Sequence, residues 1–144
     1  MLNKNKSKYV GLDYGLRRSG VSISDSNKTI SFPLDTLKTN RLLAYLKELS
    51  NNENIEKIII GKPLKLNNKS HNLEKYILEF IDSLKLNLPN ICIERVDERF
   101  TSKISKKIVL ASGLNRERRK DKSIIDKISA SLILESYLNQ KNKW

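Results

Sequence analysis

The chain has 144 residues, 38% of them hydrophobic and 31% charged, which is typical of one soluble globular domain spanning residues 1–144. Its formal net charge of +12 favours a polyanion partner, and nucleic acid is the first candidate. The single cysteine, Cys92, excludes a disulfide framework, and the single histidine, His71, argues against His-rich metal sites and Ser-His-Asp chemistry. The chain has a polar start and lacks an apolar run that could span a bilayer, so we expect a cytoplasmic protein.

Three short strands are predicted at the start of the chain, over residues 8–14, 21–25 and 29–32. Polar connections between them are short, which predicts an antiparallel meander. Pro33 is expected to end the third strand, because proline cannot donate a ladder hydrogen bond.

Helices and strands alternate in the rest of the sequence. Apolar spacing predicts helices over 42–49, 73–84, 104–109 and 125–138, and strands over 55–60 and 91–96. Thr39 or Asn40 is the expected N-cap of the first helix, and Cys92 is expected to be a small buried side chain. Strands that are joined through helices are normally parallel, with right-handed crossovers. The sequence therefore predicts an α/β fold, a five-stranded mixed sheet with helices on both faces.

Asp13 stands near the end of the first predicted strand. Alternation places it on the same face as Tyr9 and Gly11, where a charge is costly unless something compensates it. Gly11 has no side chain and leaves room above the strand. Asp13 either caps the turn that begins near Gly15 or belongs to a functional site, and this segment alone favours neither.

Two further acidic positions are predicted at the same edge of the sheet. Asp97 and Glu98 follow the fifth strand, and open α/β sheets bind ligands at the carboxyl ends of their strands. Asp126 lies near the start of the last helix, where acids are common because of the helix dipole. However, Ser129 and Ala130 lie about one turn further on the same face, and small residues there let the helix approach the sheet.

Three carboxylates in one place would repel one another, and a divalent cation usually compensates them. Mg²⁺ prefers carboxylate and water oxygens. Two such ions about 4 Å apart can activate a water and stabilise the leaving oxygen in phosphodiester cleavage. We therefore expect Asp13, Asp126 and either Asp97 or Glu98 to bind Mg²⁺ or Mn²⁺, with Asp13 bridging two ions.

Basic residues cluster beside these acids. They are predicted to bind substrate phosphates and comprise Arg17, Arg18, Lys62, Arg99, Arg116, Arg118, Arg119 and Lys120. Arginine is uncommon elsewhere in the chain, so a uniform lysine bias does not explain the cluster. For residues 116–122 the alternative is a solvated basic loop.

Several segments resemble the YqgF family, bacterial proteins that are similar to Holliday junction resolvases. The matching residues are Gly11-Leu12-Asp13-Tyr14-Gly15, Arg18, Gly20-Val21, Ser24-Asp25, Gly61-Lys62-Pro63, Asp97-Glu98-Arg99-Phe100-Thr101 and Ile125-Asp126. They cover essentially the whole chain in order.

The resemblance implies a ribonuclease H-like fold and a cytoplasmic nuclease in maturation of the 5′ end of 16S ribosomal RNA. It implies that Asp13, Glu98 and Asp126 are the acidic positions of the site, with Arg18 and Arg99 as its basic ones. The chain departs from the family where Asn67-Asn68-Lys69 stands in place of a usual glycine, and where Ser129 precedes Ala130 in place of two alanines.

Three other functions remain open from the sequence. The same residues could cleave DNA junctions, because phosphate contacts do not identify the sugar. A non-catalytic nucleic-acid-binding or ribosome-associated factor would also be basic. An ATP-binding domain of the actin and sugar-kinase type shares the Gly-x-Asp-x-Gly pattern, but its nucleotide cleft needs two such domains.

Overall fold

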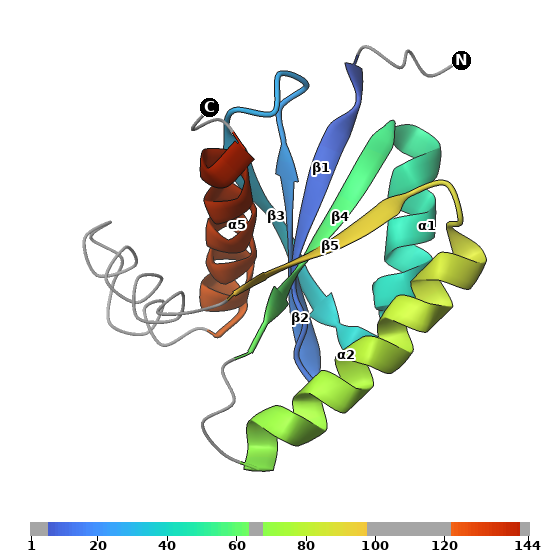
Figure 1. Ribbon diagram of the computed structural model, residues 1–144, viewed down its shortest axis with the longest axis vertical. Helices are drawn as coiled ribbons and strands as arrows, with labels where there is room; N and C mark the ends of the chain where they lie inside the picture. The colour runs from blue at the N-terminus through green and yellow to red at the C-terminus, as the bar shows by residue number, and fades with distance from the viewer. Residues whose placement is uncertain (1–5, 64–67, 98–121, 142–144) are drawn as a thin grey trace.

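A mixed sheet of five strands forms the centre of the computed structural model, which describes residues 6–63, 68–97 and 122–141 (Figure 1). The strands are β1 (Lys8–Asp13), β2 (Arg18–Ser24), β3 (Ser31–Lys38), β4 (Ile55–Lys62) and β5 (Cys92–Asp97), in the spatial order β3-β2-β1-β4-β5. The first three strands pair antiparallel, which confirms the meander. β4 pairs parallel with β1 and with β5, so the sheet is mixed as expected.

Helices cover both faces of this sheet. One face carries α1 (Leu42–Asn52), which follows a 3₁₀ turn over Thr39–Arg41, and α2 (Asn68–Asn87). The opposite face carries α5 (Lys122–Lys141), drawn in red in Figure 1. The helix predicted over 104–109 lies outside the described residues. Of the helices in the described ranges, none has the length and apolar character needed to cross a bilayer.

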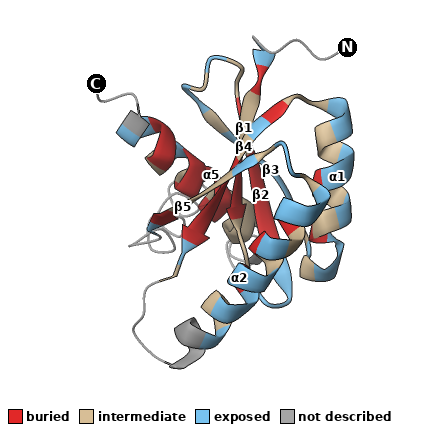
Figure 2. Ribbon diagram, turned by 45° about the vertical axis from the view of Figure 1, so that its right-hand side comes forward, coloured by how far each residue is buried: buried red, intermediate tan, exposed pale blue. Residues whose placement is uncertain are grey.

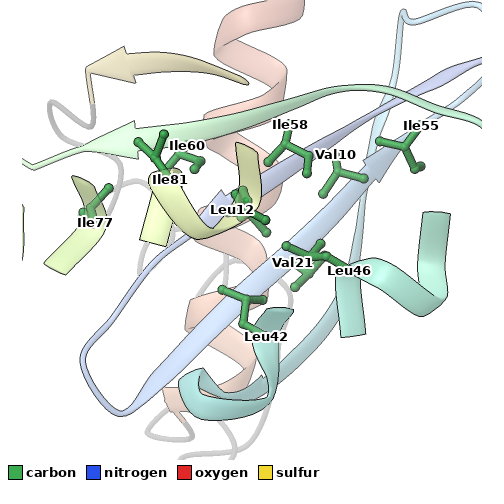
Figure 3. Packing of buried hydrophobic residues seen from close by; sticks show 11 residues of the cluster. Val10, Leu12, Val21, Leu42, Leu46, Ile55, Ile58, Ile60, Ile77 and Ile81 are labelled. Atoms are coloured by element: carbon green, nitrogen blue, oxygen red, sulfur yellow. The ribbon is translucent and has the colours of Figure 1, made fainter. Parts of the chain in front are cut away.

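Strand alternation divides the core into two layers. Val10 and Leu12 of β1 face α1 and α2, where they pack with Ile58 and Ile60 of β4 (Figure 3). Ile59 faces the other way and packs under α5. Each fully buried side chain of this size contributes about 1.5–3 kcal/mol. The buried centre of the sheet in Figure 2 confirms that the apolar run of β4 is a central strand covered on both faces.

The predicted end of the third strand at Pro33 is wrong, because β3 continues to Lys38. β3 is an edge strand with one neighbour, so a residue without an N–H is tolerated there. The pairing with β2 also shifts register between Val21 and Ser22, which absorbs the irregularity.

Two further local predictions are wrong. Neither Thr39 nor Asn40 caps α1: the N-cap residue is Arg41, without a side-chain hydrogen bond, because the Thr39 hydroxyl donates to the carbonyl of Gly15. Cys92 is exposed, because it begins β5, the other edge strand of the sheet.

Candidate active site at the carboxyl edge of the sheet

Asp13 ends β1 on the face that α5 covers. Two positions earlier on that face, a Cβ added to Gly11 would lie 2.7 Å from Leu134 Cβ and 2.8 Å from the Ala130 carbonyl oxygen. Tyr9, two positions earlier again, packs edge-on against Tyr137 with ring centroids 5.8 Å apart. Because side chains alternate along a strand, the partly buried Asp13 points to the same side.

Asp126 reaches the same edge because a glycine lets α5 descend onto the sheet. Gly20 of β2 is the cross-strand partner of Asp13. A Cβ on Gly20 would lie 2.0 Å from the carbonyl oxygen of Asp126 and 2.9 Å from the nitrogen of Lys127. The first part of α5 therefore lies directly over the residue beside Asp13. The predicted meeting of β1 and the last helix at this edge is seen in the backbone contacts.

Small buried residues of α5 make this approach possible, as the sequence predicted. Ser129 is 3% exposed and Ala130 is fully buried. The Ser22 hydroxyl donates a 2.7 Å hydrogen bond to the Ala130 carbonyl, and the Thr36 hydroxyl donates a 2.5 Å bond to the Ser123 carbonyl. These strand hydroxyls fix the height and register of the helix over β2 and β3.

Arg18 is the basic residue that the structure places beside an acid of the site. Its Nε lies 3.7 Å from Oδ2 of Asp126, and the two side chains are 40% and 26% exposed. An exposed pair of this kind contributes only about 0–1 kcal/mol, so its importance is positional. The guanidinium neutralises part of the acidic charge and remains accessible from solvent.

The turn after Asp13 is held by a network that the sequence analysis missed. The Ser19 hydroxyl accepts from the Gly15 N–H at 3.3 Å and lies 2.8 Å from the Thr39 hydroxyl. Thr39 donates at 2.6 Å to the Gly15 carbonyl, and its N–H donates to the Arg17 carbonyl at 2.9 Å. Ser19 is fully buried. The segment that carries the two arginines is therefore fixed to the start of the 3₁₀ turn.

Lys62 and Asp97 lie at the expected edge, as partners at the ends of β4 and β5. Lys62 shares the side of the sheet that Ile60 occupies, and Asp97 shares that of Ile93, so both belong to the α2 side. Asp13 belongs to the α5 side. The register thus separates these two residues from Asp13, and it argues against Asp97 as the third acid.

The other predicted site residues lie outside the described residues. They are Glu98, Arg99, Arg116, Arg118, Arg119 and Lys120. Within the described ranges, no group of three His, Cys, Asp or Glu side chains lies together as a metal site would require. The structure therefore brings Asp13 and Asp126 to one edge, while the meeting of three carboxylates stays a prediction.

The opposite end of the α5 face carries an ion pair that sequence reasoning also missed. Lys57 Nζ lies 3.1 Å from Oε2 of Glu94 and 3.0 Å from the Tyr137 hydroxyl, which itself donates to Glu94. The hydrogen bond with Tyr137 is the largest of the effects that raise the pKa of Lys57. Burial, followed by the hydrogen bond to Glu94, raises the pKa of Tyr137. The available signal was a charged residue, Lys57, directly before the apolar run 58–60.

Comparison with known proteins gives consistent matches over nearly the whole chain. The family model RuvX, described as Holliday junction resolvase, matches residues 7–140. A Bacteroides fragilis protein named "Putative pre-16S rRNA nuclease" is 41% identical over 135 residues, which are 94% of this chain and 98% of that protein. A Flavobacterium psychrophilum protein of the same name is 36% identical over 132 residues, 92% of this chain and 96% of that protein.

A solved structure shows the same fold at low sequence identity. It is "T. thermophilus RuvC in complex with Holliday junction substrate", with a TM-score of 0.60 and 13% identity over 95% of this chain and 96% of that one. A second RuvC structure from Thermus thermophilus has a TM-score of 0.55 at 10% identity. These neighbours confirm the expected ribonuclease H-like fold.

Proposed function

The chain belongs to the RuvX family, and from this premise we propose that it is a nuclease that hydrolyses phosphodiester bonds during 5′-end maturation of precursor 16S ribosomal RNA. The relatives' names support the reaction and the substrate. The observation that carries the proposal is the close approach of Asp126 to Gly20, the partner of Asp13, which brings two acids of the predicted set to one sheet edge. Because this substrate is ribosomal RNA, we propose that the protein acts in the cytoplasm.

We propose that Asp13, Asp126 and Glu98 hold Mg²⁺ or Mn²⁺, two ions in the active complex. The donor set fits, because its atoms are carboxylate oxygens, which these hard cations prefer. Glu98 is assigned from the sequence alternation with Glu94 and Val96. Bound there, such ions would supply an activated water and stabilise the leaving oxygen.

The protein's own groups position the acids and the substrate. Arg18 orients Asp126 through their 3.7 Å contact, and its exposed guanidinium can contact a phosphate next to the scissile one. The Ser19–Thr39 network keeps the turn after Asp13 from moving when substrate binds. In the proposed complex, flanking phosphates are contacted by Arg99, Arg116, Arg118, Arg119 and Lys120. Lys62 lies on the α2 side of the sheet and is not among these contacts.

Cleavage of precursor 16S ribosomal RNA by Asp13→Asn and Asp126→Asn variants tests the proposal. Loss of a residue that only supports a metal ligand lowers activity roughly 10- to 100-fold. Each of these changes removes a ligand itself, so each should lower the cleavage rate by more than that. Asp97→Asn is the matched control, because it removes the same charge at the same edge on the α2 side. Wild-type rates in both site variants would leave a non-catalytic binding factor as the explanation.

Metal binding has a separate readout. Mg²⁺ should raise the Tm of the wild type, because a ligand that binds only the folded state stabilises it, and the rise should disappear in Asp13→Asn. An equal rise in both proteins would remove Asp13 from the metal site.

Cleavage of DNA junctions is the second candidate, and the description of the matching family model favours it. The same variants should be assayed on a four-way DNA junction and on the precursor RNA side by side. If the wild type cleaved the junction faster than the RNA, a DNA substrate would replace the RNA assignment. Loss of junction cleavage in Asp13→Asn would show that the same site carries out that reaction.

A further inference from the structure

A basic groove lies beside the turn that follows Asp13. It has a volume of about 520 Å³ and is lined by Leu16, Arg17, Arg18, Lys38 and Asn40. Three of these residues are cations and none of them is acidic. Leu16 is 58% exposed, so the groove also presents an apolar side chain to solvent.

The strand pairing places two of the cations directly opposite each other. Arg18 of β2 is the cross-strand partner of Lys38 of β3, and both belong to the α5 side of the sheet, with Gly20 and Thr36. Like charges that face each other across a strand pair are unfavourable. An anion bound between them would relieve that repulsion, which makes the groove suited to a phosphate.

The backbone of the groove is held in place by hydrogen bonds within the protein and does not depend on a bound ligand. Thr39 stands between Lys38 and Asn40, and its N–H and hydroxyl bond the Arg17 and Gly15 carbonyls. The buried Ser19 hydroxyl completes this network at 2.8 Å from that of Thr39. The backbone of both walls is therefore fixed, and a ligand needs to order only the side chains.

Arg18 joins the groove to the acidic edge, since it lines the groove and also contacts Asp126. Lys38 lies two strands from Asp13 and two residues beyond Thr36, the partner of Gly20. With strands about 4.8 Å apart and a rise of about 3.3 Å per residue, Lys38 is roughly 12 Å from Asp13. A phosphate held there belongs to a different nucleotide from the one that is cleaved.

We propose that this groove binds a backbone phosphate of the nucleic-acid strand that passes over the acidic edge, with Lys38 and Asn40 as contacts in addition to the two arginines. The strand runs past the Arg18 end of β2 and the Lys38 end of β3, beside the start of α5, and Leu16 packs against its sugar or base. This inference deepens the proposed function, because it assigns the path of the substrate strand away from the cleaved bond.

The test is equilibrium binding of a short single-stranded RNA, measured by fluorescence anisotropy over a series of salt concentrations. EDTA and an Asp13→Asn background prevent cleavage in every sample. Lys38→Ala should reduce the slope of log K against log salt by about 0.7, the value for one phosphate contact to a single strand. At low salt, Kd should rise about two- to fivefold, which is the loss of one exposed charge contact.

Lys75→Ala is the matched control, because it removes the same charge from an exposed position on α2, on the other face of the sheet. Its slope should stay at the parent value, and Lys38→Arg should restore the slope lost in Lys38→Ala. Equal slopes for Lys38→Ala and Lys75→Ala would overturn the proposal. Cleavage is not part of this measurement, so full activity in Asp13→Asn would refute the nuclease site and leave the groove result standing.

Discussion

Replacement of Gly20 by alanine tests the contact on which the site depends. The added Cβ would lie 2.0 Å from the Asp126 carbonyl oxygen, and ordinary contact begins at about 3.4 Å. The first turn of α5 must therefore retreat by about 1.4 Å. Without a clash, Gly→Ala in a strand stabilises by about 0.5–1 kcal/mol, whereas forcing extra volume into a packed site costs about 1–3 kcal/mol. The 2.0 Å approach puts the cost in the upper part of that range, at about 2–3 kcal/mol, and a gain of about 1 kcal/mol leaves a net loss of about 1–2 kcal/mol.

Two measurements follow from this displacement. The Tm should fall by roughly 3–8 °C, as expected for that loss in a chain of this length. The cleavage rate at a temperature where the variant is fully folded should fall about 100-fold, because an error of about 1 Å in the position of a catalytic group has an effect of that size.

Ala130→Gly is the comparison for Gly20→Ala. It loosens the same helix by about 1 kcal/mol through helix propensity, but it adds no atom against the sheet. Its Tm should fall similarly, while its cleavage rate at the permissive temperature stays near that of the wild type. If Gly20→Ala retained full activity, or both variants lost activity equally, the position of Asp126 over Gly20 would not matter for catalysis.

Two further predictions concern stability. Ser22→Ala removes the buried 2.7 Å hydrogen bond to the Ala130 carbonyl and should cost about 0.5–1.5 kcal/mol in urea unfolding; an unchanged midpoint would show that the bond contributes nothing. Burial raises the pKa of Asp25, but hydrogen bonds from Ile30 and Thr29 outweigh burial and lower that pKa below its usual 3.8. These bonds therefore stabilise the fold above pH 3.8, and their contribution is lost as pH falls through the folded-state pKa. The Tm gap between wild type and Asp25→Asn should therefore narrow between about pH 5 and pH 3, and a constant gap would contradict this linkage.

The alternation of side chains along the first strand was the sequence pattern that best predicted the site. The order Tyr9, Gly11, Asp13 requires no knowledge of the rest of the fold, because successive side chains of any strand point to opposite faces. The small residues Ser129 and Ala130 also predicted the close approach of the helix, since a helix can approach a sheet closely only where its side chains are short.

What the sequence could not show depends on contacts between distant segments. Pairing of β4 with β1 inserts a strand between Asp13 and the end of β5, and no local pattern encodes that order. Thr39 was read as a helix cap because threonine favours that position, but its hydroxyl bonds the turn at Gly15. A hydroxyl can satisfy several partners, and only the tertiary structure decides which one it takes.

The two ends of α5 are attached to the sheet by different kinds of contact, and this difference explains where the site lies. The helix runs antiparallel to β1, so Tyr137 meets Tyr9 at one end and Asp126 meets Gly20 at the other. The Tyr137 end is attached through long side chains: its ring packs against Tyr9, its hydroxyl bonds Lys57 and Glu94, and rotation about side-chain torsions can absorb small shifts of the helix. The Asp126 end rests on hydroxyl-to-carbonyl bonds and on a glycine, which fix position within narrow limits. Asp126 must meet Asp13 at one edge of the sheet, so its end of α5 needs contacts that allow little movement of the helix backbone. The hydroxyl-to-carbonyl bonds and Gly20 supply those contacts.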